Sequence, residues 1–432
     1  MAVMNLQVTI QGVPAGILHQ DEAGMMSFAY RKGYAGIPLS LSMPVSNRAY
    51  NQKVVRPYLF GLLPDSESQR MAIASEFDVK PNNPVALLFH IGRDCPGAVQ
   101  FFPCDENGSV KDREVRREAY RPVLDHEIAL RLKEIRTSDD DSWMGRDESW
   151  SLGGYQGKFA LALRDGVWCA CEGTAATTHI FKNGVRGYKL EALNEYVCMR
   201  TAQLCGIPTA NVSYLTFEDE PALVIERYDR MRGIAGTIVR VHQEDCCQAL
   251  GYMPNMKYTK DGGPSTASII KLLGTTGEAA INIRQFTHML FYNYAIGAPD
   301  AHAKNYSLLL GKAGGVLLAK MYDVASGLCY DELRKKGRLA MPIGGENRFG
   351  RMGRGAIERY AGKNDVEVAA IMERVGLDTS GCVETLASLV QRVPGAMEEV
   401  FDEAGKLPGV DELRSRLLGE VRELCETTLR QL

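Results

Sequence analysis

The chain has 432 residues, more than one hydrophobic core normally serves, so two or three domains are expected. Hydrophobic residues make up 45% and charged residues 24%, a globular composition that argues against long disordered spans. The formal net charge of −3 argues against general adhesion to nucleic acid or to anionic membranes.

The location of the protein is suggested by what the sequence lacks. No apolar run approaches the ~18 residues that cross a bilayer, and the N-terminus lacks the basic and apolar blocks of a signal peptide. The eleven cysteines have no zinc-site spacing, since Cys169 and Cys171 are too close and Cys246 and Cys247 are adjacent. We expect a cytoplasmic protein with reduced thiols and no membrane partner.

The front of the chain alternates between apolar and polar residues. This pattern predicts strands over residues 6–10, 15–19, 26–30 and 97–102. Residues 50–77 read as two helices broken at Pro64-Asp65. Residues 104–150, with the acidic triplet Asp139–Asp141, read as the most linker-like part of the chain.

The remainder changes from mixed to helical character. Strands are predicted over residues 158–164, 167–171, 212–215 and 222–226, and a helix over 189–205 that stops at Gly206 and Pro208. After about Arg230 the chain reads mainly as helices, the clearest being 265–273, 283–294, 365–375 and 410–431. An α/β front half therefore precedes a helical back half, and a cleft between two such lobes would suit a small ligand.

Three oxygen-bearing side chains carry the strongest chemical signal. Asp300 and Asn305 lie on one short loop after an apolar helix, and Asp323 follows two strand-like segments at 306–310 and 315–320. Phosphoryl transfer needs a carboxylate that orients the attacking hydroxyl and accepts its proton. It also needs oxygen ligands for magnesium, which an amide and a second carboxylate supply. A strand–turn–strand would bring both ends of this segment together.

A simpler interpretation of the same loop stays open. Asp and Asn are common turn residues, and an isolated pair with this spacing most often marks a turn. A zinc role for His302 is weaker, because no second His or Cys has a suitable spacing.

A glycine-rich segment, residues 151–158, precedes the predicted strand at 158–164. Glycines let backbone N–H groups approach phosphates closely. The segment lacks the Walker pattern, which disfavours a P-loop NTPase, and glycine-rich turns before strands are common.

Two further segments fit nucleotide binding. Lys182 ends a strand-like segment and could contact phosphates, with Glu195 on the next helix positioning it. Residues 222–230 form an apolar strand that ends at the expected lobe junction, where backbone groups could bind an adenine edge. The alternative interpretations are that Lys182 is a surface lysine, that Glu195 is a solvated glutamate, and that residues 222–230 are an ordinary core strand.

These elements, in this order, resemble the HipA kinase family. The likeness rests on residues 151–158, Lys182, 226–230, 242–245 with 248–251, 300–305 and 322–323. The front half is similar to the family's N-terminal module at residues 38–44, 62–65, 91–94 and 97–99. The resemblance covers nearly the whole chain.

The resemblance implies an α+β, two-lobed protein-kinase-like fold with an α/β N-terminal half and a mainly helical C-terminal half. It implies an N-terminal module at 1–110, a kinase N-lobe at 111–225 and a helical C-lobe at 226–432. It also implies an ATP- and Mg-dependent serine/threonine kinase with Asp300 as catalytic base and Asn305 and Asp323 as magnesium ligands. The implied ATP-binding residues are Gly153, Gly154, Tyr155, Gln156, Gly157, Lys158, Lys182, Glu226, Arg227, Tyr228, His302, Ala303, Lys304, Asn305, Tyr322 and Asp323.

Ser151 matches the serine that family members autophosphorylate. A phosphate there would add about −1.5 to −2 charges to a loop that must fold over ATP, so we expect self-inactivation. Three positions depart from common family choices: Ala298, Tyr155 and Gly157. The last two lie in the loop that the resemblance implies covers ATP.

The resemblance also implies partners. Family members are toxins held by a HipB-type helix-turn-helix antitoxin, the pair binds operator DNA, and some members modify an aminoacyl-tRNA synthetase. A basic stretch supports a DNA or substrate contact, although a solvated loop is as good an interpretation; its first members are Arg334, Lys335, Lys336 and Arg338. Two competing functions are a kinase of a small molecule or lipid and a non-catalytic antitoxin-binding co-repressor.

Overall fold

The computed structural model describes residues 3–110, 117–137 and 148–432. Its internal contacts divide the chain into two compact units. The first comprises Met1–Arg186, Leu215–Asn255 and Leu308–Gly314, and the second comprises Gly187–Tyr214, Met256–Ser307 and Gly315–Leu432. The three domains expected from the sequence, at 1–110, 111–225 and 226–432, remain a proposal.

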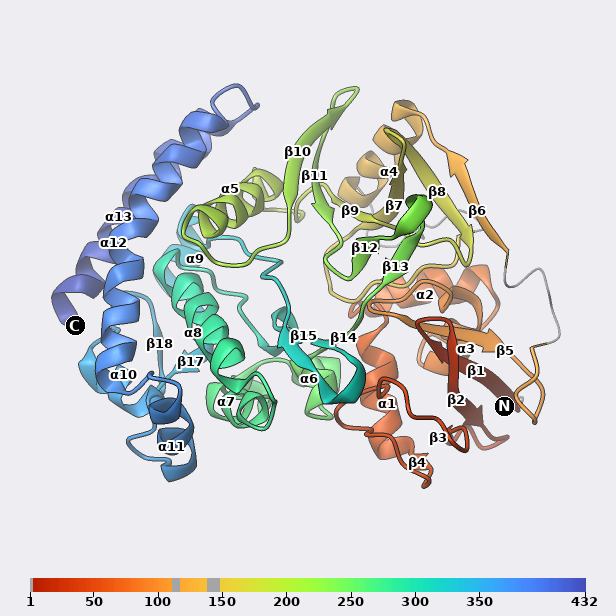
Figure 1. Ribbon diagram of the computed structural model, residues 1–432. Coiled ribbons are helices and arrows are strands. Elements are labelled where there is room, and N and C mark those ends of the chain that lie inside the picture. Colours follow the sequence, from red (N-terminus) through yellow and green to blue (C-terminus); the bar gives the residue numbers. More distant parts are fainter. Residues whose placement is uncertain (1–2, 111–116, 138–147) are drawn as a thin grey trace. The chain divides into compact units, whose positions relative to one another are not determined.

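The first unit begins with a five-stranded antiparallel sheet in the order β4-β3-β2-β1-β5 (Figure 1). Gln11 and Gly12 join the first two strands with positive φ at both positions, as a tight two-residue hairpin requires. The strand predictions for this part of the chain are confirmed. The strands are β1 Met4–Ile10, β2 Val13–Gln20, β3 Met26–Tyr30, β4 Tyr50–Asn51 and β5 Val99–Pro103.

Three helices connect β4 to β5: α1 Gln52–Gly61, α2 Glu67–Glu76 and α3 Pro84–Ile91. Each helix begins after an N-cap residue whose side chain accepts a hydrogen bond from a backbone N–H of the first turn. These N-cap residues are Asn51, Ser66 and Asn83, respectively. Both α1 and α3 pack against the sheet. The predicted helix pair with its break at Pro64-Asp65 is confirmed. Helix α3 was not predicted, because its nearly continuous apolar run shows no helical period.

A second antiparallel sheet in this unit contains β11-β9-β7-β8-β6 in that order. The chain re-enters the unit within β10 Val212–Phe217. Phe159 and Phe181 stack with their ring centroids 5.0 Å apart on adjacent strands of this core. The predicted strands are again confirmed. Their bounds are β7 Phe159–Arg164, β8 Val167–Gly173, β9 His179–Lys182 and β11 Glu220–Glu226, and the sheet also contains β6 Glu118–Pro122, which was not predicted.

The prediction of a linker over residues 104–150 is wrong for part of that stretch. It contains β6 and the helix α4 Asp125–Thr137, which packs against β9 and β11. Ile128, Leu132 and Ile135 are buried in the core of this sheet at helical spacing. The many charges on the opposite face hid that short apolar stripe. The acidic triplet Asp139–Asp141 lies outside the described residues.

Short strands follow β11, where mainly helices were expected. They are β12 Arg230–Arg232, β13 Ile238–Arg240 and β14 His242–Asp245, followed by α6 Cys246–Ala249. Glu244 on β14 is fully buried, and it accepts hydrogen bonds from the Ser40 hydroxyl at 2.5 Å and the Leu41 N–H at 2.7 Å. Burial raises the pKa of Glu244 to about 8.

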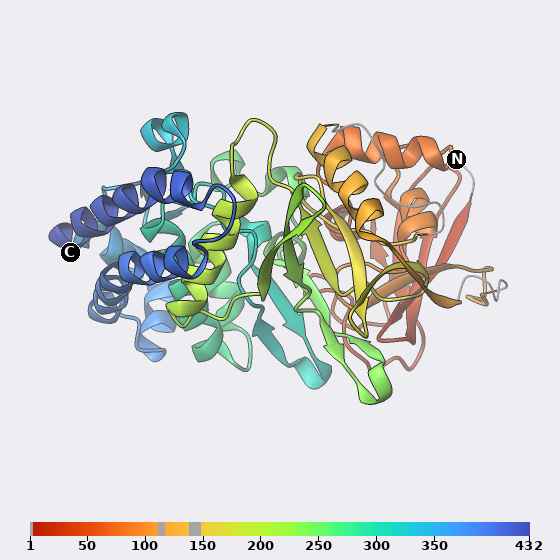
Figure 2. The same cartoon turned by 90° about the horizontal axis from the view of Figure 1, so that it is seen from above.

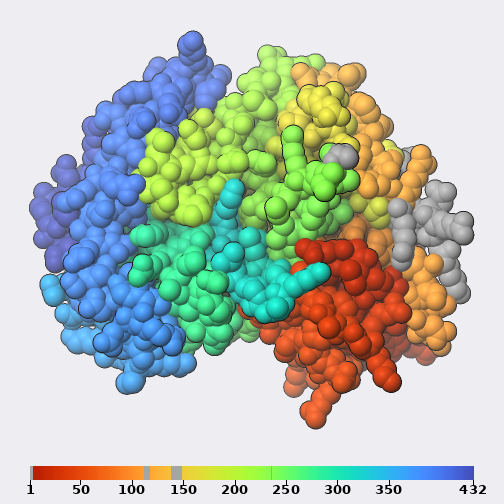
Figure 3. Space-filling model, viewed as in Figure 1, coloured from red at the N-terminus to blue at the C-terminus, as the bar shows by residue number. Residues whose placement is uncertain are grey.

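The second unit is mainly helical, as predicted. Its long helix α12 packs against α5, α8 and α13, and α12 and α13 run side by side in both ribbon views (Figures 1 and 2). The blue surface of these C-terminal helices is continuous in the space-filling view (Figure 3). The helices are α5 Glu191–Leu204, α7 Thr266–Gly274, α8 Ala279–Ala295, α9 Asp331–Lys336, α10 Arg354–Tyr360, α11 Val366–Arg374, α12 Thr379–Glu403 and α13 Val410–Gln431.

Four short strands complete the fold: β15 Ser307–Leu310, β16 Val316–Leu318, β17 Arg338–Ile343 and β18 Glu346–Arg348. Helices are combined with antiparallel sheets, which confirms the α+β class. All eleven cysteines are free thiols. Within the described ranges, no helix combines the length and the apolar character needed to cross a membrane.

Candidate active site

The loop that carries Asp300 and Asn305 follows the buried helix α8. Gly297 turns the chain with φ 66°, and a Cβ there would lie 2.4 Å from a Leu328 side-chain carbon, so the position requires glycine. The His302 N–H donates to the Asp300 carbonyl at 2.8 Å, and the Asn305 N–H donates to the His302 carbonyl at 2.9 Å. These two tight turns fold Asp300 and Asn305 toward each other.

The side chain of Asn305 bonds to the main chain of the other two residues predicted from the sequence. Its Nδ2 donates to the carbonyl of Asp300 at 2.8 Å and to the carbonyl of Asp323 at 3.5 Å. The second distance is at the limit of a hydrogen bond. Asp300, Asn305 and Asp323 therefore meet in the second unit, and 60% of the Asp300 side chain is exposed to solvent.

Tyr258 is a site residue that sequence reasoning missed. Its hydroxyl donates to Asp300 Oδ1 at 2.7 Å, and its ring lies edge-on to the ring of His302 with centroids 5.1 Å apart. The Ala303 N–H donates to the Lys257 carbonyl at 3.3 Å, which ties the two segments together. No local sequence pattern marks Tyr258, because it comes from a separate segment and tyrosine is common in ordinary cores.

His302 lies within this loop, between Asp300 and Asn305, and is 4% exposed. Burial lowers the pKa of His302 below its ordinary value and outweighs the opposing effect of Asp300. The ring is therefore neutral at physiological pH, and the 3.8 Å between its Nε2 and Asp300 Oδ2 is no ion pair. Its buried Nδ1 has no hydrogen-bond partner among the residues that the structure describes.

Asp323 is held in an unusual backbone conformation. Its φ is 59°, in the left-handed region that non-glycine residues seldom adopt. The adjacent Tyr322 donates its hydroxyl to the Lys304 carbonyl at 2.7 Å and shares a 2.6 Å hydrogen bond with Ser307. The segment that carries Asp323 is thus fastened to the one that carries Asn305.

In the first unit, the glycine-rich segment is docked on residues that follow α1. The Asp65 N–H donates to the Gly154 carbonyl at 2.9 Å, and Gln69 Nε2 donates to the Tyr155 carbonyl at 3.0 Å. Gly154 has φ 103°, and a Cβ there would lie 2.5 Å from Lys158 Nζ. Lys158 itself donates to the Gly153 carbonyl at 2.9 Å. The segment is a defined loop whose shape needs glycine at position 154.

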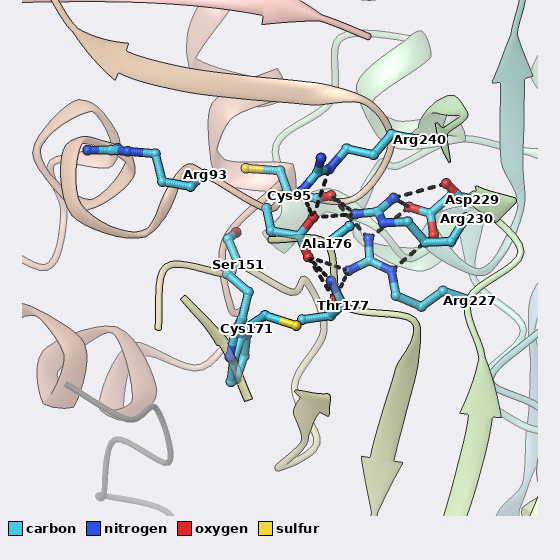
Figure 4. A network of polar contacts seen from close by, with 12 residues as sticks. Arg93, Cys95, Ser151, Cys171, Ala176, Thr177, Arg227, Asp229, Arg230 and Arg240 are labelled. Carbon is cyan, nitrogen blue, oxygen red and sulfur yellow. Dashed lines mark hydrogen bonds and ion pairs between the residues drawn. The ribbon is translucent and has the colours of Figure 1, made fainter. Parts of the chain in front are cut away.

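Ser151 is buried beside a network of polar side chains (Figure 4). Its hydroxyl donates to the Leu62 carbonyl, and its N–H donates to the Asp94 carbonyl at 3.0 Å. The Asp94 N–H in turn donates to the Ser149 carbonyl at 3.1 Å. The main chain of Asp94 therefore holds the Ser149–Ser151 segment through an isolated parallel bridge at Trp150.

The carboxylate of Asp94 lies at the centre of that network. It contacts Arg230 Nη2 at 2.9 Å, Arg240 Nη2 at 2.8 Å and Thr177 Oγ1 at 2.7 Å. Arg227 is 3.4 Å away and pairs more closely, at 2.8 Å, with Asp229. Burial alone would raise the pKa of Asp94, but the three guanidinium groups and the Thr177 hydroxyl hold it well below its ordinary value. The buried charges are therefore all present at neutral pH.

Family models match most of the chain. One, the HipA-like C-terminal domain, matches residues 150–397, and a second, the HipA N-terminal domain, matches residues 6–102. The chain belongs to the HipA family.

Individual HipA relatives span nearly its full length. A Sinorhizobium fredii protein named as a kinase, Y4mE, is 31% identical over 416 residues, 94% of this chain and 96% of that protein. The serine/threonine-protein kinase toxin HipA of Shewanella oneidensis is 29% identical over 391 residues, 88% of this chain and 83% of that protein. The HipA family is thus a kinase family, and the fold agrees with it.

A solved HipA structure supports the same fold. It contains HipA, HipB and their operator DNA from the Shewanella oneidensis MR-1 toxin–antitoxin system. The likeness has a TM-score of 0.81 at 25% identity and covers 98% of this chain and 97% of that one. The HipA kinase fold predicted from the sequence is confirmed.

The other predicted nucleotide contacts lie in the first unit. Lys182 ends β9 and is 3% exposed, opposite Leu223 of β11. Arg227 is committed to the Asp94 network, so only its main chain could contact a nucleotide. The Tyr228 hydroxyl donates to Gln243 Oε1 at 2.5 Å. Glu195 belongs to the second unit, so its pairing with Lys182 stays a prediction.

The basic stretch is partly neutralised by acidic neighbours. Arg334 contacts Asp331 at 2.8 Å and Glu420 at 2.5 Å. Lys335, Lys336 and Arg338 are exposed. These three residues are therefore better candidates for a phosphate contact than Arg334.

Proposed function

We propose that the protein uses ATP and magnesium to phosphorylate a serine or threonine of another protein. The observation that carries the proposal is the position of Asn305, whose amide nitrogen bonds to the carbonyls of both Asp300 and Asp323. A catalytic base and two magnesium ligands at one place are what phosphoryl transfer requires.

The residues present fit a magnesium ion. Asn305 Nδ2 is used by the backbone, so its remaining polar atom is an oxygen acceptor, and Asp323 supplies a carboxylate. Among the described residues, no cluster of three or more His, Cys, Asp or Glu forms a protein-only metal cage. Magnesium typically takes one or two protein oxygens together with nucleotide phosphates, and it neutralises charge that develops on them.

Each remaining site residue has a role in this proposal. Asp300 is exposed enough to reach a substrate hydroxyl, and Tyr258 fixes one of its carboxylate oxygens. Lys182 contacts the phosphates, the 153–158 loop covers them, and backbone groups of Glu226–Tyr228 bind the base. His302, Ala303, Lys304 and Tyr322 line the nucleotide site.

Transfer of labelled phosphate from ATP tests the proposal. The full chain should label protein in a bacterial lysate, whereas Asp300→Asn should lose about 10³-fold or more in rate while retaining partner binding. Label that appears only in small molecules or lipids would favour the alternative substrate class. Toxicity that persists in Asp300→Asn would favour the binding-only co-repressor.

Self-inactivation at Ser151 is also proposed. Ser151 is 1% exposed and both its hydroxyl and its N–H are bonded within the first unit, so a phosphate cannot be accommodated there without moving the segment. The added charge of about −1.5 to −2 would drive the loop off its docking site. Ser151→Asp should therefore weaken ATP binding, and full activity in this variant would refute the mechanism.

The proposed partners follow from the family. We propose a HipB-type antitoxin, operator DNA bound through that complex, and a protein substrate, with an aminoacyl-tRNA synthetase as one candidate. The eleven free thiols support a cytoplasmic location.

A further inference from the structure

We propose that Asn194 and Ser326 form a clamp that positions Asp323 for magnesium, an inference that rests on the proposed function. Asn194 lies on α5, and Ser326 follows Asp323 in the chain; both belong to the second unit. Neither residue touches the reacting groups, so both are positioning residues.

The side-chain amide of Asn194 hydrogen-bonds to both main-chain polar groups of Ser326. Its Nδ2 donates to the Ser326 carbonyl at 2.7 Å, and its Oδ1 accepts from the Ser326 N–H at 3.2 Å. Its second donor and second acceptor contact the thiols of Cys329 at 3.5 Å and Cys198 at 3.3 Å. All four hydrogen-bonding positions of a fully buried amide are thus used. Such an arrangement specifies one geometry for the main chain at Ser326.

Ser326 extends the clamp to the loop that carries Asp300. Its hydroxyl donates to the Ile296 carbonyl at 2.5 Å and accepts the Leu328 N–H at 3.1 Å. The next residue, Gly327, donates its N–H to the Gly297 carbonyl at 2.9 Å. Ile296 and Gly297 are the point where α8 passes into the Asp300 loop. Ser326 therefore connects α5, the Asp300 loop and the Asp323 segment through hydrogen bonds.

Asp323 lies between this clamp and a second anchor. The Met321 N–H donates to the Pro208 carbonyl at 2.8 Å, and the Met321 carbonyl accepts the Ala210 N–H at 2.9 Å. Between these fixed points Asp323 keeps its left-handed conformation, which persists only where the surroundings determine it. Releasing the Ser326 end would let Asp323 relax away from Asn305.

The clamp makes magnesium affinity depend on α5. Groups that orient a metal ligand from outside typically change metal affinity or activity by about 10–100-fold when they are removed. A role in general packing would instead lower stability without a selective effect on the metal. The two roles can therefore be separated by measuring nucleotide binding with and without magnesium.

The experiment uses the full chain with Asp300→Asn in every sample, so that no phosphate is transferred. ATP affinity is measured by calorimetry in Mg²⁺ and again in EDTA. Ser326→Ala should weaken ATP binding by about tenfold or more in Mg²⁺ and leave it unchanged in EDTA. Asn194→Asp, which places a carboxylate against the Ser326 carbonyl, should have a larger effect in the same direction.

Thr201→Val is the matched control. Thr201 is equally buried on α5, but its hydroxyl bonds to the Val197 carbonyl at 2.8 Å and to the Tyr292 side chain on α8, and neither of these residues belongs to the clamp. This variant should bind ATP like its parent in both buffers. Thermal unfolding without ligand shows which variants are folded, and Ser326→Ala, which removes one hydroxyl, provides the decision if Asn194→Asp does not fold.

The outcomes are distinct. Folded Ser326→Ala with parental affinity in Mg²⁺, or with equal weakening in both buffers, overturns the clamp but leaves the proposed function standing. A parent whose ATP binding does not respond to Mg²⁺ overturns the metal site itself, and the clamp with it.

Discussion

At the scale of single residues, the site depends on polar groups that serve two segments at once. Asn305 was predictable because it shares a loop with Asp300, and a second acid, Asp323, follows the two strand-like segments after that loop. Tyr258, Asn194 and Ser326 were not predictable. Their importance comes from contacts between segments distant in the sequence, and nothing in their own neighbourhoods indicates those contacts.

Tyr258→Phe should lower kcat and leave the KM for ATP unchanged. The variant removes the 2.7 Å hydrogen bond to Asp300 Oδ1, and a hydrogen bond to a charged group is worth about 1.5–3 kcal/mol, or about 10–100-fold in rate. Steady-state transfer of labelled phosphate measures both constants. Tyr188→Phe, at a tyrosine remote from Asp300 in the sequence, is the control, and equal losses in the two variants would contradict the assigned contact.

Glu244 should make stability depend on pH. Its pKa is raised from 4.5 to about 8 in the folded protein, so the folded state binds this proton more tightly than the unfolded chain does. The free energy of unfolding should therefore decrease as pH rises from about 5 to about 8, by on the order of 1 kcal/mol per pH unit from this group. Below that window the group contributes no pH dependence.

The comparison is with Glu244→Gln, which imitates the protonated acid. Urea unfolding at pH 5.5 and pH 8.5 should show the variant gaining stability relative to the unmodified protein at the higher pH. A difference between the two proteins that stays constant with pH would show that Glu244 does not hold a proton in this range.

At the scale of elements, prediction succeeded where periodicity was undisturbed. Strands such as β1 and β3 and the helix α13 match their predicted positions closely, because their buried faces recur at regular intervals. Helix α4 was missed because charges surround a three-residue apolar stripe. The strands β12 and β13 were missed because each has only three residues and they pair only with each other. The strand β14 was missed because it pairs with β15, a segment distant in the sequence.

The intact Asp94 network should contribute strongly to the free energy of unfolding of the first unit. Asp94→Asn leaves two buried guanidinium groups, of Arg227 and Arg230, and the partly buried one of Arg240, with Asp229 as the remaining carboxylate of the network, and breaking a buried pair in this way costs about 3–5 kcal/mol. The pKa of Asp94 is lowered in the fold, so its contribution is present at neutral pH and is lost as pH falls through the acidic range. Denaturant unfolding measures the loss.

An exposed pair provides the control for that experiment. Lys271 contacts Glu367 at 2.9 Å, and the Glu367 side chain is 65% exposed. Glu367→Gln should change the free energy of unfolding far less than Asp94→Asn does. A similar effect from the two substitutions would mean that burial does not strengthen the Asp94 network.

At the scale of the whole molecule, the sequence was sufficient for the α+β class and the family, because widely separated motifs occur in the family's order. The charge environment of surface residues was harder to predict from the sequence. The basic stretch looked uniform in the sequence, but Arg334 is offset by Asp331 and Glu420, which no inspection of residues 334–338 alone could show.

Charge reversal at Lys335, Lys336 and Arg338 should therefore weaken operator binding by the antitoxin complex more than reversal at Arg334. Each lost phosphate contact reduces the slope of log affinity against log salt by about 0.9. Fluorescence anisotropy over a range of salt concentrations measures the slope. An unchanged slope in the triple variant would reject the DNA role and leave the protein substrate or solvent as the neighbour of this surface.

The buried charges around Asp94 also bear on how such proteins can evolve. Asp94 lies in the segment matched at 6–102, whereas Arg227, Arg230 and Arg240 lie in the segment matched at 150–397. Recombination could join these two segments from different ancestors. Unless the residues at all four positions still formed ion pairs, it would leave a guanidinium group inside the protein without a carboxylate partner. Inheritance should therefore transmit the two segments as a pair, and a substitution at one of the four positions should be tolerated only with a compensating change at another.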